Sequence, residues 1–303
     1  MLNLAELIAL RQDLASLRKI VYFHENQLEY PCREEKERDV QFGYAQMLTC
    51  MVADVVCWNS RYNMTSFLHG LHGKLLRLMP PDQRLDSVAE AIRQKSVVLY
   101  YPIVLSLPAP LLSCTTVEKE EGPLHIVWNH RWEWDKGPDQ FFKSIFALQQ
   151  EGLAFHVSVL GEQFGEVPEV FEEARKRLEP HIRHWGFLSS KDAYYKALRE
   201  ADVVVSTALH EFFGVSVVEA IEQGCWPICP NRLVFPEYLP SDHLYNTETQ
   251  LVKKLRYFAR YPGKLRHVKK EKHGGGPVVD LSPFSWNNSL RHRYKALLTL
   301  RDE

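Results

Sequence analysis

The most informative stretch of the sequence is His210-Glu211-Phe212-Phe213-Gly214-Val215-Ser216-Val217-Val218-Glu219. An apolar run at residues 203–205 precedes it and a helical pattern follows it to residue 224, so the order is strand, loop, helix. Glu211 and Glu219 are eight positions apart, slightly over two helical turns, so both lie near one face at the helix N-terminus. Free N–H groups at such an end suit a diphosphate. We expect Glu219 to accept hydrogen bonds from sugar or ribose hydroxyls, and Glu211 to face the transferred group.

The two glutamates resemble a known motif. With Phe213 and Gly214 after the first glutamate, the stretch is similar to the E-x7-E motif of retaining, nucleotide-sugar-dependent glycosyltransferases of the GT-B architecture (family 4 type). The resemblance implies that Phe213, Gly214 and Val215 line the donor site. The structural alternative is a solvated helix face with one glutamate that complements the helix dipole.

Length and composition indicate a globular protein of more than one domain. The chain has 303 residues, 45% of them hydrophobic and 25% charged, which is enough for two buried cores. A net charge of -1 excludes a globally basic nucleic-acid binder but leaves room for a local patch. The six cysteines form no C-x-x-C pair, which favours free thiols in a reducing compartment. No apolar run approaches a membrane span and no secretion signal begins the chain, so we expect no membrane association and a cytoplasmic location.

Strands and helices alternate along the chain. We predict strands at 20–23, 55–58 and 96–101 in the first half, with helices at 36–53 and 61–68. A Pro-containing stretch at 105–123 without periodicity reads as a linker. The second half alternates more cleanly, with strands at 124–128, 155–160, 203–205 and 226–229, which implies a covered parallel sheet. The predicted fold class is α/β, and the predicted domains are 1–117, 118–282 and a helix within 283–303 that crosses back to the first domain.

The first half carries one distinctive polar cluster. His24, Glu25, Asn26 and Gln27 follow the strand at 20–23, where a parallel sheet places its ligands. These side chains can bind an acceptor's hydroxyl groups or activate one of them. A histidine that caps a neighbouring helix is the alternative. Asn59 follows the next strand, and an Asx-type turn explains it equally well.

A second polar loop follows the strand at 124–128. Arg131 and Lys136 bracket this loop, where two cations can clamp a diphosphate and stabilise its departure. The pattern resembles the Arg…Lys-Gly element that family 4 glycosyltransferases use for that purpose. Gly161 ends the next strand and lets a nucleotide approach the backbone, and residues 185–188 resemble the segment beside the nucleotide base. The alternative for Arg131 and Lys136 is a solvated surface position. The alternative for Gly161 and residues 185–188 is an ordinary turn or core segment.

Five short motifs together resemble a narrower family. They are Tyr-Phe-His-Glu-Asn-Gln at 22–27, Trp-Asn-Ser at 58–60, His-Arg-Trp-Glu at 130–133, His-Glu-Phe-Phe-Gly at 210–214 and Pro-Phe-Ser-Trp at 283–286. This set is similar to the tRNA-queuosine mannosyltransferases. The resemblance implies transfer of mannose from GDP-mannose to queuosine in the anticodon of tRNA(Asp), in the cytoplasm or nucleus, with Glu211 and His24 as catalytic residues. No metal is expected, because the cations and the helix N-terminus take over that charge and no Asp-x-Asp motif is present.

One departure keeps other hypotheses open. Members of that family begin with an extra strand and a Gly-Gly-Ser-His loop, and this chain contains neither, so we expect an incomplete N-terminal domain. The alternatives are an inactive fragment or isoform that binds nucleotide sugar or tRNA, and a family 4 enzyme with a lipid or glycan acceptor. A basic segment at 253–272 either contacts tRNA phosphates or forms a solvated helix face. The sequence does not indicate an oligomeric state.

Overall fold

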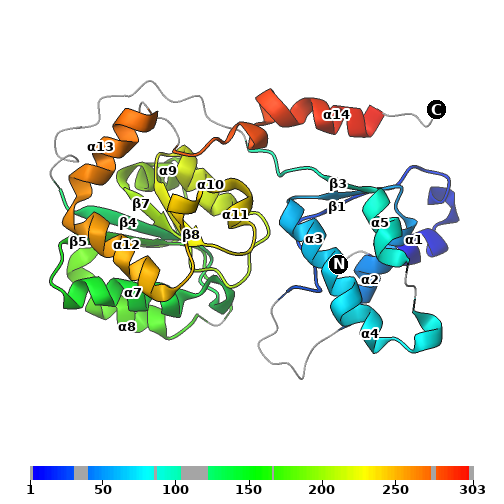
Figure 1. Cartoon of the computed structure of the whole chain (residues 1–303), viewed down its shortest axis with the longest axis horizontal. Helices are drawn as coiled ribbons and strands as arrows, with labels where there is room; N and C mark the ends of the chain where they lie inside the picture. The colour runs from blue at the N-terminus through cyan, green and yellow to red at the C-terminus, as the bar shows by residue number, and fades with distance from the viewer. Residues whose placement is uncertain are drawn as a thin grey trace. The chain divides into compact units, whose positions relative to one another are not determined.

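The chain folds into two compact units, each with its own parallel sheet. The computed structural model describes residues 3–30, 40–84, 87–103, 122–165, 167–273 and 278–299. Unit 1 combines residues 1–103 with 283–303, and unit 2 comprises residues 104–282 (Figure 1). The predicted boundary between residues 117 and 118 lies outside the described residues, as does most of the predicted linker.

Unit 1 is built on three parallel strands in the order β1-β2-β3. The predicted strands are confirmed, although the third is shorter than expected. The strands are β1 (Ile20–Phe23), β2 (Val55–Trp58) and β3 (Ser96–Val98). The helices of the unit are α1 (Leu4–Leu10), α2 (Val40–Val52), α3 (Arg61–Gly70), α4 (Leu76–Leu78), α5 (Val88–Gln94) and α14 (Arg291–Thr299).

Both faces of this sheet are covered. Val56 and Trp58 of β2 belong to a core that α2, α3 and α5 complete, whereas Cys57 packs with Leu290 on the opposite side. This division follows from the alternation of side chains along a strand. The C-terminal segment covers the second side, where Tyr294 stacks 6.4 Å from Tyr22.

The third helix is longer than the sequence predicts. We expected a helix at 61–68, but α3 continues to Gly70 and leads through a π-helical turn at Leu71–Leu75 into α4. A Cβ atom on Gly70 would lie 2.9 Å from Leu28 Cβ. The glycine therefore permits close packing against Leu28, and the usual reading of glycine as a helix terminator fails here.

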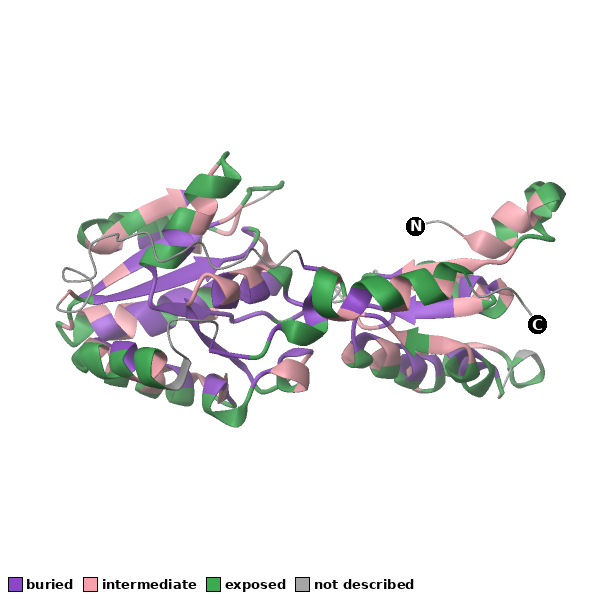
Figure 2. Ribbon diagram, turned by 90° about the horizontal axis from the view of Figure 1, so that it is seen from above, coloured by how far each residue is buried: buried purple, intermediate pink, exposed green. Residues whose placement is uncertain are grey.

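Unit 2 contains a six-stranded parallel sheet in the order β6-β5-β4-β7-β8-β9. Valine-rich strands such as Val203–Val205 are buried on both faces, as expected for a covered parallel sheet (Figure 2). The strands are β4 (Leu124–Asn129), β5 (Phe155–Leu160), β6 (Ile182–Gly186), β7 (Val203–Val205), β8 (Trp226–Pro230) and β9 (Leu244–Tyr245).

Helices cover both faces of the second sheet (Figure 1). Helices α7, α8 and α12 lie on one face, and α9 and α10 lie on the other. The helices of the unit are α7 (Pro138–Gln150), α8 (Val170–Arg177), α9 (Lys191–Glu200), α10 (Val215–Glu222), α11 (Phe235–Tyr238), α12 (Glu248–Arg260) and α13 (Pro262–His273). Within the described residues, none of the helices is long and apolar enough to cross a membrane.

The strand order of unit 2 determines where a ligand binds. The chain proceeds from β4 outward to β6 and then returns to β7, on the other side of β4. In open parallel sheets, ligands bind beyond the carboxyl ends of the strands at the point where the order reverses. Here that point lies between β4 and β7, so the loops that follow these two strands are the place to look for a site.

Candidate functional site

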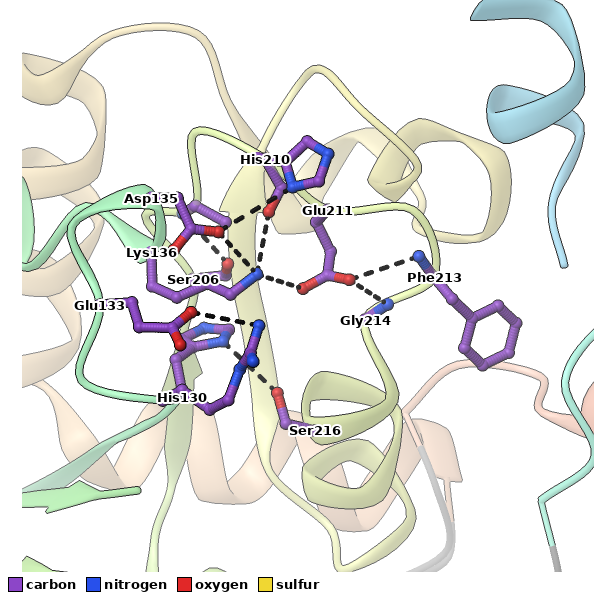
Figure 3. Close-up of polar contacts among 12 residues, drawn as sticks. His130, Glu133, Asp135, Lys136, Ser206, His210, Glu211, Phe213, Gly214 and Ser216 are labelled. Atoms are coloured by element: carbon purple, nitrogen blue, oxygen red, sulfur yellow. Dashed lines mark hydrogen bonds and ion pairs between the residues drawn. The ribbon is translucent and has the colours of Figure 1, made fainter. Parts of the chain in front are cut away.

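A buried lysine joins the two loops at this switch point. Lys136 ends a short 3-10 turn after β4, and its Nζ lies 3.5 Å from Oε2 of Glu211, in the loop after β7 (Figure 3). The same Nζ lies 3.2 Å from Oδ2 of Asp135 and donates to the carbonyl oxygen of His210 at 3.1 Å. Lys136 is only 8% exposed, so the ammonium group is held by the protein and not by solvent.

The charges of this cluster stabilise one another. Burial disfavours the charged form of Lys136, but Glu211 and Asp135 outweigh that effect and raise the lysine pKa above its ordinary value. Burial likewise opposes ionisation of Glu211, yet Lys136 and backbone N–H groups lower its pKa. The site therefore presents an ionised carboxylate and an ammonium group side by side at neutral pH.

The backbone around α10 fixes the Glu211 carboxylate. Its Oε1 accepts hydrogen bonds from the N–H groups of Gly214 at 3.0 Å and Phe213 at 3.4 Å. Gly214 has φ 81°, in the left-handed region, and directly precedes the first residue of α10, Val215. The expected donor-binding segment 213–215 thus places Glu211 at the helix N-terminus, with Phe213 itself 3% exposed.

The second glutamate of the motif lies on α10 and faces two tyrosines. The hydroxyl groups of Tyr194 and Tyr195 donate to the carboxylate of Glu219 at 3.3 and 3.5 Å. The Tyr194 hydroxyl also accepts from Nδ2 of Asn129, at the end of β4, at 3.0 Å. Burial raises the pKa of Glu219 above its ordinary value. The sequence pattern does not indicate either tyrosine as a site residue, because both lie on α9 and approach Glu219 only in the folded protein.

A buried histidine is the main residue that the sequence analysis left out of the site. His130, 4% exposed, follows β4, and its Nδ1 lies 3.4 Å from the hydroxyl oxygen of Ser216 on α10 (Figure 3). Burial, reinforced by Lys136, lowers the His130 pKa to about 4, so the ring is neutral at physiological pH. Its position between a buried strand and Arg131 was the available signal.

Arg131 and Gly161 complete the neighbourhood. Arg131 is half exposed and its guanidinium pairs with Glu133 at 3.1 Å, while its charge still lowers the pKa of Lys136 slightly against the stronger effect of the carboxylates. Gly161 has φ 153°, and a Cβ atom there would collide with the carbonyl oxygen of His130. The loop after β4 therefore requires a glycine at position 161 whether or not a nucleotide binds there.

The predicted acceptor-side residues all lie in unit 1. His24 and Glu25 are exposed, and Gln27 donates from Nε2 to Glu25 at 3.1 Å. Asn26 is fully buried instead, and its Nδ2 donates to Asn63 Oδ1 at 3.0 Å. Asn59 is 4% exposed and donates to the carbonyl oxygen of His24 at 2.6 Å. In this structure the two asparagines hold the loop, and His24, Glu25 and Gln27 remain accessible to a ligand.

The basic segment at 253–272 is largely engaged within unit 2. Arg256 and Arg260 of α12 both pair with Glu151. Arg266 of α13 donates two hydrogen bonds to the carboxylate of Asp202, and both of these residues are buried. These contacts anchor the two helices to the sheet. In the described part of the chain, no group of three or more His, Cys, Asp or Glu side chains is arranged to hold a metal ion.

Comparison with protein families finds two matches that divide the chain much as the fold does. The N-terminal model of tRNA-queuosine alpha-mannosyltransferase matches residues 1–103. The model of glycosyl transferases group 1 matches residues 116–272. A tRNA-queuosine alpha-mannosyltransferase of Drosophila melanogaster is 44% identical over 269 residues, which cover 88% of this chain and 71% of that protein.

Solved structures share the fold at low identity. HepE of Anabaena, in complex with UDP, is 13% identical with a TM-score of 0.65, over 98% of this chain and 76% of that chain. Sucrose-phosphate synthase of Thermosynechococcus elongatus is 14% identical with a TM-score of 0.64, over 96% of this chain and 70% of that chain. The predicted GT-B fold, with two parallel α/β units, is confirmed.

Proposed function

Because the chain belongs to the tRNA-queuosine alpha-mannosyltransferase family, within the group 1 glycosyltransferases, we propose that it transfers mannose from GDP-mannose to queuosine in tRNA. The acceptor in this proposal is the queuosine of the tRNA(Asp) anticodon, and the anomeric configuration is retained. Such an acceptor puts the protein in the cytoplasm or nucleus. The observation that carries the proposal is the ion pair between the buried Lys136 and the half-buried Glu211 at the switch point of the donor-type unit.

In the proposed donor complex, three positive features surround the diphosphate. Lys136 supplies a fixed ammonium group, Arg131 supplies a half-exposed guanidinium group, and the N-terminus of α10 supplies a favourable dipole. Arg131 would exchange Glu133 for a phosphate group, two of whose oxygens it can bind with two parallel hydrogen bonds. No metal ion is required in this proposal, because these groups neutralise the charge that develops on the leaving diphosphate.

The two glutamates have different proposed roles. Glu211, ionised and held by two N–H groups, faces the mannosyl group and stabilises positive charge at its anomeric carbon. Glu219 accepts hydrogen bonds from the ribose hydroxyls of the nucleotide, in exchange for the long contacts that it makes with the tyrosines of α9. The lengths of those contacts, 3.3 and 3.5 Å, support such an exchange.

In the transfer step, the bond between the anomeric carbon and the diphosphate oxygen breaks. A new bond forms between that carbon and a hydroxyl oxygen of the queuosine cyclopentene diol, and GDP leaves. The hydroxyl proton must be removed, and we assign its removal to His24, with Glu25 and Gln27 as contacts for the acceptor. The exposure of His24 and Glu25 and the half-buried position of Gln27 support that assignment, whereas Asn26 and Asn59 act by holding their loop.

The test is product formation by the full chain. GDP-[14C]mannose is incubated with tRNA that carries queuosine, beside Arg131→Ala, Glu211→Ala and the surface control Glu172→Ala on α8. We expect label in tRNA with the parent chain and the control, and its loss in the two site variants. Transfer that survives Glu211→Ala would contradict the catalytic assignment. If the parent chain binds GDP-mannose but transfers no mannose, it is a nucleotide-sugar-binding protein and not a transferase. If it does not bind GDP-mannose, the proposed donor site is wrong.

A further inference from the structure

The imidazole of His130 is a buried group of the donor site to which the proposed function gives no role. His130 directly follows β4, the strand that borders the switch point. Its side chain is inaccessible to bulk solvent, with only 4% of the residue exposed. A polar ring in this position requires partners for both nitrogen atoms, because a buried polar group without a hydrogen bond is costly.

Among the described residues, only one of the two ring nitrogens of His130 has a partner. Nδ1 lies 3.4 Å from the hydroxyl oxygen of Ser216, in the first turn of α10. Nε2 is fully buried and has no hydrogen-bond partner in the described part of the chain. The neighbouring Trp132 shows the same pattern, with a buried Nε1–H that finds no acceptor there. Orphaned groups that gather after one strand end indicate a ligand that satisfies them.

The surroundings of His130 indicate what kind of ligand this is. Lys136 and the α10 N-terminus are positive, whereas Glu211 and Asp135 already share the lysine. A hydroxyl proton donated by Ser216 to Nδ1 leaves the other proton of the neutral ring on Nε2. An N–H group beside an ammonium group and a helix N-terminus suits an anionic oxygen.

We propose that His130 is a further donor-binding residue, whose Nε2–H donates a hydrogen bond to a phosphoryl oxygen of the nucleotide-sugar diphosphate while Nδ1 accepts the hydroxyl proton of Ser216. This inference rests on the proposed function. Because burial keeps the ring neutral, His130 adds a hydrogen bond without a second positive charge next to Lys136. Asn129 supports the arrangement, since its Nδ2 donates to the carbonyl oxygen of Ser216 at 2.7 Å and ties α10 to β4.

Two amide substitutions separate the nitrogens of this ring. The side-chain nitrogen of His130→Gln reaches the position of Nε2, whereas that of His130→Asn reaches only the position of Nδ1. The dissociation constants of GDP and guanosine are measured by isothermal titration calorimetry for the parent chain and both variants. Circular dichroism establishes that each variant is folded.

We expect His130→Asn to weaken GDP binding about 10- to 100-fold, the range for one lost hydrogen bond to a charged group. His130→Gln should remain within about threefold of the parent chain, and guanosine binding should be unchanged in both variants. Ser216→Ala should weaken GDP binding by less than His130→Asn, because the ring keeps its Nε2–H group and loses only the hydrogen bond at Nδ1.

Two results would overturn the role of His130. One is a folded His130→Asn variant that binds GDP like the parent chain, and the other is an equal loss of affinity in the Asn and Gln variants. Loss of guanosine affinity together with GDP affinity would also overturn it, because the contact would then not involve the diphosphate. A parent chain that binds no GDP would contradict the proposed donor site itself, so the two failures are distinguishable.

Discussion

The polar loops at the strand ends of the two units differ in how completely their hydrogen bonds are satisfied. In unit 1, Asn26, Asn59 and Asn63 are buried neutral amides that bond to one another and to backbone carbonyl groups. In unit 2, the loops after β4 and β7 bury an ammonium group and carboxylates, and the Nε2 of His130 has no partner among the described residues. The first network is closed, and the second leaves hydrogen-bonding capacity unused.

This difference separates residues that hold a loop from residues that await a ligand. A satisfied buried network stabilises the folded state and gains nothing from a ligand. A buried charge pair with orphaned neighbours is costly until a ligand completes it, so its retention indicates binding or catalysis. Substitutions in the two networks should therefore be read out by different measurements.

The largest effect is expected at Glu211. Glu211→Gln preserves the size of the side chain and removes the charge that Lys136 and the α10 backbone stabilise. We expect the rate of mannose transfer to fall about 1000-fold, in the range for loss of one fixed electrostatic group. Initial rates with labelled GDP-mannose provide the measurement, with Glu172→Gln on α8 as the control. A variant that keeps more than about a tenth of the parent rate would contradict the prediction.

The next effect is expected on the stability of unit 1. Asn63 donates to Phe23 O and Asn59 Oδ1 and accepts from Asn26, all within the protein interior. Asn63→Ala should lower the free energy of unfolding by about 2 to 3 kcal/mol, because it leaves buried partners unsatisfied. Urea unfolding tests this, with the exposed Thr65→Ala as the control. An unchanged unfolding midpoint would show that the network is not the support of the loop.

A smaller effect is expected at Glu219. Glu219→Gln should raise the KM for the donor about tenfold and leave kcat less affected, since the ribose contact proposed for Glu219 is remote from the transferred sugar. Burial raises the pKa of Glu219, so the carboxylate is present above that pKa and donor affinity is lost as the pH falls through it. Steady-state kinetics over pH test both points. A pH dependence of KM that persists unchanged in Glu219→Gln would assign it to another group.

The smallest effect is expected in the basic segment at 253–272. Arg256 is engaged by Glu151, so Arg256→Ala removes an internal contact and not a free cation. We expect tRNA affinity to change less than about twofold and the salt dependence of binding to keep its slope. Filter binding at several salt concentrations provides the measurement. A slope reduced by about one would instead assign Arg256 to a phosphate contact.

Local patterns were sufficient for the main elements and for the centre of the site. The valine-rich strand, Glu211, the glycine at the start of α10 and Lys136 before α7 are adjacent to turns whose chemistry can be read directly. Parallel strands then bring the loops after β4 and β7 to one edge, and the pairing of these two strands in the sheet brings Lys136 and Glu211 together. The helical continuation beyond residue 68 was not predicted, and in it Gly70 packs closely against Leu28.

The sequence by itself determined the α/β class, the strand–loop–helix site and the chemical types of its residues, since these depend on periodicity and on neighbours along the chain. Only the tertiary structure decided which polar groups are satisfied. The sequence suggests Asn26 and Asn59 as ligand contacts, but in the structure both are hydrogen-bonded to Asn63. It likewise suggests Arg256 as a phosphate contact, but in the structure Arg256 donates to Glu151. For His130, the structure shows that Nδ1 contacts Ser216, whereas Nε2 is buried without a hydrogen-bond partner among the described residues. The physical reason is that hydrogen-bond satisfaction depends on residues far apart in the chain, and their distances are set by packing.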